Sequence, residues 1–306
     1  MEKVLLIGSS GFLGSAVKET LLKYDLYETV EITGKEHVDI TNKNELETFI
    51  KDAKPDYLIN CAAFVGGVSY GYKYQSKLLE ENIKMALNIY EISNRYNIKK
   101  IINPISNCVY PASISEYIEA KLLDGPPHES VYYYAMSKRF LIDLSNSYFT
   151  NHKLTSNNVI LSNMYGPQDH FDSDRSHALG ALINKIHEAK KNNSNIEIWG
   201  SGNQEREWLY VNDGAESLVR CLDIQPEHST FNVGVNKTIS INDLANIIST
   251  EIEFKGNYDY NLSKPEGVFK KSVNGQLGEN LLGWTPQTNL STGIKETIKW
   301  YLKNHG

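Results

Sequence analysis

Tyr134 and Lys138, in the segment YAMSK, are the two side chains whose spacing points most directly to chemistry. Residues four positions apart lie on the same face of a helix. If both are buried, we expect the ammonium group to lower the pKa of the phenol below its usual value of about 10. The phenol can then protonate a carbonyl oxygen while a hydride reaches the carbon. The simpler interpretation is an ordinary pair on a helix surface.

Ser106 and Cys108 lie two residues apart in the segment ISNCVYP. The preceding apolar residues, KKIIN, predict a strand, so the serine falls where that strand ends. Ligands bind outside the carboxyl ends of the strands in open α/β sheets. We therefore expect the Ser106 hydroxyl group to hydrogen-bond the same substrate oxygen as Tyr134. An isolated cysteine at this place is most simply a small core residue.

The segment GSSGFLG follows the first apolar run, with Gly8, Gly11 and Gly14 in the pattern GxxGxxG. Such glycines allow a tight turn and a close approach of the backbone to a pyrophosphate. A helix after the turn presents free N–H groups and a positive dipole end to the same anion. Because the pattern stands between a predicted strand and a predicted helix, it indicates a dinucleotide site rather than a purely structural turn.

The end of the second predicted strand, EITGKEH, indicates which dinucleotide binds. NAD sites usually carry an acidic residue there for the ribose 2′-hydroxyl group. Thr33 and Gly34 occupy that position and Lys35 follows, which favours the 2′-phosphate of NADP(H). Asp39 is placed either to meet the adenine end or to cap the next helix.

Short apolar runs alternate with amphipathic segments through the first half of the chain. This alternation predicts βαβ units and a parallel sheet. The strands are expected at 3–8, 29–33, 56–63, 99–106 and within 155–167, and the helices at 11–24, within 39–54, at 77–98 and at 132–152.

The predicted fold class is α/β: a Rossmann-type, doubly wound parallel sheet with a smaller C-terminal substrate-binding region. Residues 1–165 are expected to form the dinucleotide-binding domain, to which a segment of about 207–233 returns. The pattern becomes polar and loop-like after Pro167, so the substrate region is assigned to 166–206 and 234–306. With no linker between them, the two regions are expected to enclose a cleft.

Composition excludes several classes of function. The 306 residues carry a net charge of -6 without a basic cluster, which argues against binding to nucleic acid. The three cysteines form no CxxC pair, so neither a disulfide framework nor a metal site is expected. No apolar stretch is long enough for a membrane span, and we predict a cytoplasmic protein without membrane contact.

The order GxxGxxG, serine, YxxxK resembles the extended branch of the short-chain dehydrogenase/reductase superfamily. A closer resemblance, over nearly the whole chain, is to the GDP-L-fucose synthase family (GDP-4-keto-6-deoxy-D-mannose 3,5-epimerase/4-reductase). It rests mainly on SNCVYP, YAMSK, NMYGPQDHF followed by SH, and WGSGNQEREWLYVND; shorter matches are VGG at 65–67, NVG at 232–234 and SKPEG at 263–267.

The resemblance implies reduction of the C4 keto group of a GDP-4-keto sugar by NADPH, with epimerisation at C3 and C5. It carries the epimerisation pair onto Cys108 and His177. A thiol whose pKa a nearby cation lowers from about 8.5 is a suitable base, and histidine is a suitable acid.

The resemblance also implies the binding residues. For the cofactor they are Gly8, Ser10, Gly11, Phe12, Leu13, Gly14, Lys35, Asp39, Ile40, Ala62, Ala63, Tyr134 and Lys138. For the GDP-sugar substrate they are Asn163, Met164, Ala178, Trp199, Arg206 and Lys271, where the two cations suit a diphosphate and Trp199 is either a stacking surface or a core aromatic. A homodimer is expected, through the helices near 76–97 and 131–152.

The chain departs from the family at four positions near the site. The family pattern has an arginine where this chain has Ser10, a glycine at Ile105, a serine at Asn107 and an arginine at Lys270. Larger residues beside Ser106 would reshape the sugar pocket.

Three alternatives therefore stay open. The chain could be a C4-reductase only, acting on a GDP-4-keto-heptose or 6-deoxy-heptose after a separate epimerase. It could instead be a reductase of the dTDP-4-keto-rhamnose type, or a non-catalytic NADP-sensing protein.

Overall fold

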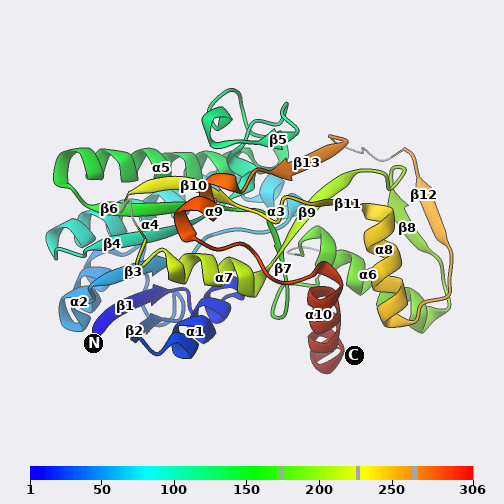
Figure 1. Ribbon diagram of the computed structural model, residues 1–306, viewed down its shortest axis with the longest axis horizontal. Coiled ribbons are helices and arrows are strands. Elements are labelled where there is room, and N and C mark those ends of the chain that lie inside the picture. The colour runs from blue at the N-terminus through cyan, green and yellow to red at the C-terminus, as the bar shows by residue number, and fades with distance from the viewer. Residues whose placement is uncertain (173–175, 225–227, 264–267, 306) are drawn as a thin grey trace.

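The protein is built around a six-stranded, wholly parallel sheet with the strand order β10-β6-β4-β3-β1-β2 (Figure 1). The computed structural model describes residues 1–172, 176–224, 228–263 and 268–305. The strands of this sheet are β1 (Glu2–Ile7), β2 (Tyr27–Ile32), β3 (Tyr57–Asn60), β4 (Lys100–Ser106), β6 (Thr155–Leu161) and β10 (Ser229–Val233).

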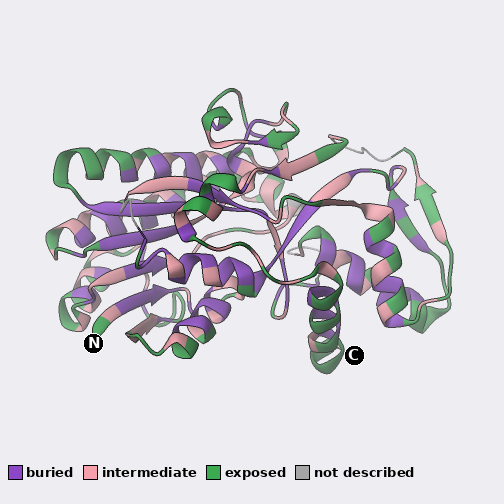
Figure 2. Cartoon of the chain, in the orientation of Figure 1, coloured by how far each residue is buried: buried purple, intermediate pink, exposed green. Residues whose placement is uncertain are grey.

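Helices cover both faces of this sheet, as the alternation of strands and helices predicted. Neighbouring residues of β1 point to opposite faces, so Val4 joins one core cluster and Leu5 the other. One cluster is covered by α1 (Phe12–Tyr24) and α7 (Val211–Arg220), and the other by α2 (Lys43–Ala53), α4 (Gln75–Arg95) and α5 (Tyr132–His152). Figure 2 shows the inner strands as largely buried, whereas the edge strand β2 is mostly of intermediate burial. The predicted Rossmann-type, doubly wound α/β class is therefore confirmed.

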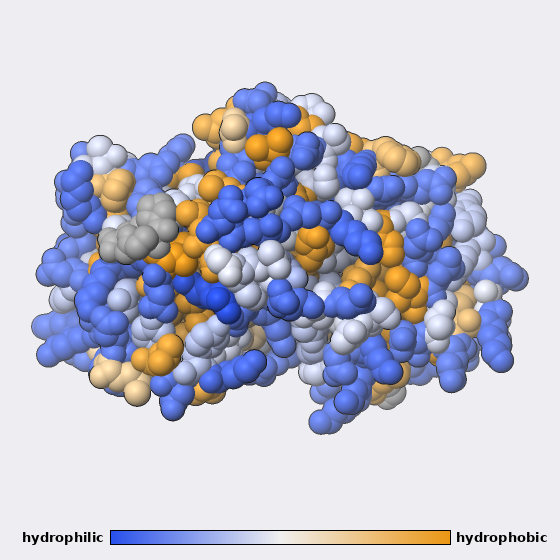
Figure 3. All heavy atoms as spheres, in the orientation of Figure 1, coloured by the Kyte–Doolittle hydropathy of each residue, from blue (hydrophilic) through white to orange (hydrophobic). Residues whose placement is uncertain are grey.

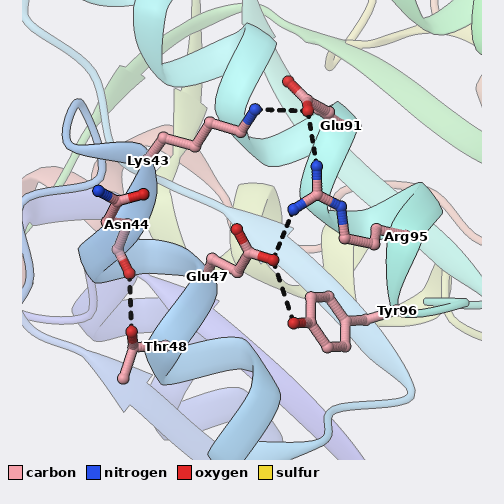
Figure 4. Close-up of polar contacts among 7 residues, drawn as sticks. All are labelled: Lys43, Asn44, Glu47, Thr48, Glu91, Arg95 and Tyr96. Carbon is pink, nitrogen blue, oxygen red and sulfur yellow. Dashed lines mark hydrogen bonds and ion pairs between the residues drawn. The ribbon is translucent and has the colours of Figure 1, made fainter.

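A network of polar side chains ties α2 to α4 at the surface (Figure 4). Arg95 donates hydrogen bonds to Glu47 at 2.6 Å and to Glu91 at 2.9 Å, while Lys43 also pairs with Glu91. Tyr96 donates to Glu47 at 3.1 Å. Because these groups are partly exposed, the network contributes little to stability compared with the apolar contacts beneath it.

Most of the remaining elements form a second layered unit around an apolar core of its own, although Tyr117 and Val273 join a core cluster of the main sheet. Its larger sheet has the order β11-β9-β13-β5, with β7 beside β9, and a separate pair joins β12 to β8. The strands are β5 (Glu116–Tyr117), β7 (Asn163–Tyr165), β8 (Ile196–Trp199), β9 (Glu205–Tyr210), β11 (Thr238–Ser240), β12 (Tyr258–Asn261) and β13 (Lys270–Val273). The helices are α6 (Ala178–Asn192), α8 (Ile241–Ile252) and α10 (Leu290–His305).

Short elements connect these layers. They are α3 (Val68–Lys73), α9 (Gln276–Leu282) and the 3-10 turns η1 (Asn107–Val109), η2 (Glu119–Lys121) and η3 (Glu129–Val131). A segment of about 207–233 was expected to return to the dinucleotide-binding domain. Within it, α7 packs on α1 and β10 completes the main sheet, whereas β9 belongs to the second sheet. The division of the chain into two domains stays a prediction.

The helices and one face of the surface show where apolar side chains lie in the described part of the chain. No helix described here is both long and apolar enough to cross a bilayer. On the face drawn in Figure 3, hydrophilic side chains predominate and apolar ones form scattered patches.

Candidate active site

The glycine-rich turn between β1 and α1 is shaped by close backbone contacts. Gly8 has a φ of +79°, and a Cβ atom there would lie 2.9 Å from the backbone nitrogen of Ala62. A Cβ atom on Gly14 would lie 1.9 Å from the Gly8 carbonyl oxygen. These approaches require glycine and bring the start of α1 to the edge of the sheet, where its free N–H groups suit an anion.

A cavity of about 300 Å³ opens at this turn. It is lined by eight of the predicted cofactor residues: Gly8, Ser10, Gly11, Lys35, Asp39, Ile40, Ala62 and Ala63. Phe12 and Leu13 instead pack against the core under α1, and Gly14 serves the turn. Cys61 and Glu81 also line the cavity, although neither was among the predicted cofactor residues.

Lys35 and Asp39 form an ion pair in this cavity, with Nζ 3.1 Å from Oδ2. Oδ1 of Asp39 accepts hydrogen bonds from the backbone N–H and hydroxyl groups of Thr41. Although burial opposes ionisation, the hydrogen bonds from Thr41 and Lys35 lower the pKa of Asp39. The alternative role of Asp39 as a helix cap is wrong, since Asn42 caps α2 by accepting from the N–H of Asn44.

The end of β4 and the first turns of α5 bring the predicted catalytic residues together. Ser106 ends β4, and its hydroxyl oxygen accepts a hydrogen bond from the Cys108 N–H at 3.4 Å. On α5, the Lys138 ammonium nitrogen lies 5.8 Å from the centre of the Tyr134 ring. The charge of Lys138 also acts on the Cys108 thiol, so the four side chains form one electrostatic unit.

Burial dominates the electrostatics of this unit and corrects two expectations. It lowers the pKa of Lys138 to about 8 and raises the pKa of Tyr134, so the expected lowering of the tyrosine pKa is wrong. It also raises the pKa of Cys108 to about 11, although a hydrogen bond with Ser106 and the charges of Lys138 and Lys271 oppose this. The two cations therefore do not offset the cost of burying a thiolate at Cys108, and for Tyr134 burial is the main cause of the raised pKa.

Lys138 is only 5% exposed, and its ammonium nitrogen faces the Tyr134 ring without a hydrogen bond to a described residue. Burying a charged group is costly, and residues with such perturbed pKa values concentrate at functional sites. A dinucleotide fits this arrangement, because ribose hydroxyl groups are suitable acceptors and the glycine-rich turn is shaped for the pyrophosphate.

A second cavity, of about 510 Å³, begins at Cys108. Asn163, Arg206 and Lys271, three of the residues predicted to bind substrate, line it, and their role stays a prediction. Burial lowers the pKa of Lys271, and the neighbouring Arg206 charge lowers it further. Two cations that repel each other in a half-buried cavity favour a bound anion.

The other predicted substrate residues lie outside this cavity. Met164 packs against the core under α7, and Ala178 is exposed at the start of α6. Trp199 is 54% exposed, with the Lys185 ammonium nitrogen 5.3 Å from the centre of its ring, so its interpretation as a core aromatic is wrong. Of the segment SKPEG, residues 264–267 lie outside the described part of the chain.

The departures from the family pattern have different consequences. Ile105 is buried in the core beneath α5 and does not reach the cavity, contrary to the expectation that it reshapes the sugar pocket. Asn107 does line the cavity, and its amide nitrogen lies 3.4 Å from Oδ1 of Asn163. His128 and Ser130 add polar groups to the same wall and were missed because HES is an ordinary loop sequence.

His177 stands at the start of α6, where Nδ1 lies 3.0 Å from Oδ1 of the buried Asp169. Although burial opposes protonation, the bond and the charge of Asp169 raise the pKa of the His177 imidazole. The centre of its ring lies 6.4 Å from that of Phe12 on α1. In the described residues no direct contact joins His177 to Cys108, so their partnership stays a prediction. Asp169 was missed because nothing in GPQDHF indicates that it faces a residue eight positions later.

The sheet, the glycine-rich turn and the Ser–Tyr–Lys unit together define an enzyme of the extended short-chain dehydrogenase/reductase class. Residues 4–234 match the family described as "NAD dependent epimerase/dehydratase family".

Full-length relatives and a solved structure narrow this class. The chain is 32% identical over 304 residues to "Putative GDP-L-fucose synthase 2" of Arabidopsis thaliana, covering 99% of this chain and 92% of the relative. It is 32% identical over 305 residues to the GDP-L-fucose synthase of Sinorhizobium fredii, covering 99% and 96%. A crystal structure of a GDP-L-fucose synthetase from Naegleria fowleri bound to NADP has a TM-score of 0.89 at 29% identity, covering 99% and 95%. The chain therefore belongs to the NAD dependent epimerase/dehydratase family and, within it, to the GDP-L-fucose synthase family.

Proposed function

We propose that the protein uses NADPH to reduce the C4 keto group of a GDP-4-keto sugar and that it also epimerises the sugar at C3 and C5. The observation that carries the reduction is the placement of Tyr134 and Lys138 on α5 next to Ser106 and Cys108 at the end of β4, beside the cavity that begins at Cys108. The family relationship supports the same reaction class.

NADP(H) is proposed as the cofactor, with its pyrophosphate at the glycine-rich turn and its 2′-phosphate near Lys35. The relative from Naegleria fowleri, which binds NADP, supports this choice. Binding of the phosphate would compete with the ion pair between Lys35 and Asp39. The bound nicotinamide would supply the hydride.

The protein's own part in the reduction is to hold the carbonyl oxygen and deliver a proton. Ser106 donates a hydrogen bond to that oxygen, and the Tyr134 phenol donates its proton. Because the pKa of Tyr134 is raised, the phenol enters the reaction protonated. The Lys138 ammonium group then stabilises the phenolate and holds the nicotinamide ribose.

Epimerisation is assigned to Cys108 and His177. A keto group at C4 acidifies the hydrogens at C3 and C5. Cys108 removes such a proton from one face of the ring, and His177 returns a proton to the enolate from the other face. The raised pKa of His177 supports its role as the acid.

The GDP part of the substrate is proposed to extend from the second cavity towards Trp199. Arg206 and Lys271 are placed for the diphosphate, and Trp199 offers an exposed ring for the base.

A homodimer is proposed through α4 and α5. Apolar residues repeat every four positions on the partly exposed side of each helix: Leu79, Ile83 and Leu87 on α4, and Met136, Phe140 and Leu144 on α5. Such rows suit a four-helix interface between two copies. The free cysteines and the use of NADPH support a location in the cytoplasm.

A second candidate is C4 reduction alone, on a GDP-4-keto-heptose that another enzyme has epimerised. The pKa of about 11 at Cys108 favours it, because little thiolate is present near neutral pH. The polar wall of Asn107, His128 and Ser130 suits the additional hydroxyl groups of a heptose. An enzyme of this kind consumes NADPH only with the substrate that has already been epimerised.

Product analysis with NADPH and a panel of GDP-4-keto hexoses and heptoses tests the proposal. We expect oxidation of NADPH with at least one of these sugars and a roughly hundredfold or greater loss of kcat in Tyr134→Phe, with NADPH binding retained. Unchanged turnover in Tyr134→Phe would refute the chemistry. Stronger competition by dTDP than by GDP would favour the dTDP-4-keto-rhamnose type, and NADPH binding without turnover of any sugar would favour a sensing protein.

A further inference from the structure

Asp169 and His177 form a carboxylate–imidazole pair beside the start of α6. The side chain of Asp169 is only 1% exposed, whereas that of His177 is 48% exposed. Oδ1 of Asp169 lies 3.0 Å from Nδ1 of His177 and also accepts a hydrogen bond from the His170 N–H at 2.8 Å. The carboxylate is therefore fixed by the backbone, and the ring reaches from it towards solvent.

The second carboxylate oxygen of Asp169 strengthens this interpretation. Oδ2 is buried and has no hydrogen-bond partner among the described residues. A Cβ atom on Gly180 would lie 3.7 Å from Oδ2 and 2.8 Å from the carbonyl oxygen of His170, so glycine lets α6 approach the carboxylate closely. A buried carboxylate whose side-chain contact is the imidazole is unusual for a purely structural residue.

This geometry determines the proton arrangement of the ring. An ionised carboxylate only accepts hydrogen bonds, so Nδ1 of His177 carries a proton directed at Asp169. Nε2 is then a free lone pair in the neutral ring and an N–H donor in the imidazolium. Among the described residues, Asp169 is the charged group that acts on the ring, and Phe12 contributes only an aromatic surface.

We propose that Asp169 is a positioning residue for proton transfer: it holds His177 with Nε2 facing the substrate and stabilises the imidazolium that protonates the enolate. This inference rests on the epimerase part of the proposed function. Without that charge, the enolate is reprotonated by Cys108 from the face on which it was formed. The hydrogen then exchanges with solvent, but the configuration is kept.

Asp169→Asn tests the proposal, because the amide oxygen can keep the bonds of Oδ1 while the charge is lost. With GDP-4-keto-6-deoxy-D-mannose in D2O and no NADPH, we expect inversion at C3 and C5 to slow roughly tenfold or more. The ratio of deuterium exchange with retained configuration to inversion, at C3 and C5, should rise. Reduction of a previously epimerised sugar by NADPH should stay near the wild-type rate. An equal loss of exchange, inversion and reduction would overturn the proposal.

Asp213→Asn is the matched control. Asp213 is also buried, but its carboxylate accepts hydrogen bonds from the N–H groups of Gln287 and Thr288 instead of an imidazole. This variant should lose stability in urea without changing the ratio of exchange to inversion. If both variants change that ratio equally, the effect is structural and the proposal fails.

An NMR titration of the histidine rings separates this proposal from the proposed function. The His177 signal is assigned by its loss in His177→Gln, and we expect Asp169→Asn to lower the pKa of that ring. An unchanged pKa overturns the role of Asp169 whether or not the enzyme epimerises. A lowered pKa in a protein that never inverts the sugar would support the pairing and refute the epimerase function.

Discussion

Replacing Lys138 by methionine should make the protein more stable at neutral pH while destroying its activity. Burial lowers the pKa of Lys138 from 10.5 to about 8, so at pH 7 the folded protein carries a buried ammonium group that the unfolded chain solvates better. A difference of about 2.5 in pKa corresponds to about 3 kcal/mol. The variant should recover up to this amount, because methionine is close to lysine in length and the ammonium group makes no hydrogen bond to a described residue.

The dependence on pH gives the sign of the effect. Between about pH 8 and pH 10.5 the unfolded chain binds a proton at Lys138 that the folded protein does not, so the wild type gains stability as the pH rises. The advantage of Lys138→Met should therefore be largest below about pH 8 and should fade as the pH approaches 10.5. Urea denaturation of both proteins at neutral pH and at about pH 9.5 measures it.

Lys100→Met is the matched control, since Lys100 is also a buried lysine. Its ammonium group donates hydrogen bonds to the carbonyl oxygens of Cys221 and Ile224 at 3.0 and 3.2 Å, beyond the end of α7. Removing it should destabilise the protein by about 2 kcal/mol or more, because those buried carbonyl groups lose their donor. The reasoning would be refuted if Lys138→Met lost as much stability as Lys100→Met. It would also be refuted if the difference in the free energy of unfolding between Lys138→Met and the wild type were the same at both pH values.

Three further predictions concern the substrate side of the site. Lys271→Ala should weaken GDP binding roughly tenfold, whereas Lys270→Ala, which removes an exposed lysine beside it, should have little effect in the same calorimetric titration. Glu207→Ala should lower the free energy of unfolding by about 3 kcal/mol or more, because its fully buried carboxylate accepts two backbone N–H groups, at 2.7 and 2.8 Å; a smaller loss in urea denaturation would contradict this. Deuterium exchange at C3 and C5 should accelerate as the pH rises towards about 11 and stop in Cys108→Ser; exchange that ignores pH would exclude the thiolate as the base.

The sequence predicts the fold well wherever one local signal decides the structure. The helix at 132–152 was predicted to the residue, since its apolar spacing and flanking turns agree. The edge strand β10 was less clear, because a strand of five residues far along the chain joins the sheet through contacts with β6 that no local pattern contains.

The position of a site residue could be predicted where a motif carries the geometry, while the role of each residue stays a prediction. The glycine-rich turn and the serine, tyrosine and lysine are such cases. The pKa values of Tyr134 and Cys108 could not be predicted, because they depend on how completely the surrounding layers exclude water. The pairing of Asp169 with His177 could not be predicted either. A loop brings the two side chains together, so their spacing follows neither the period of a helix nor that of a strand.

The most direct test of the central claim is the isotope pattern of the product formed from GDP-4-keto-6-deoxy-D-mannose and unlabelled NADPH in D2O. If the protein both epimerises and reduces, the product carries deuterium on carbon at C3 and C5 and a cofactor-derived hydrogen at C4. A product with no deuterium at C3 or C5 would rule out epimerisation by this enzyme. A failure to oxidise NADPH with this sugar, its epimerised form or the heptose analogues would contradict the account as a whole.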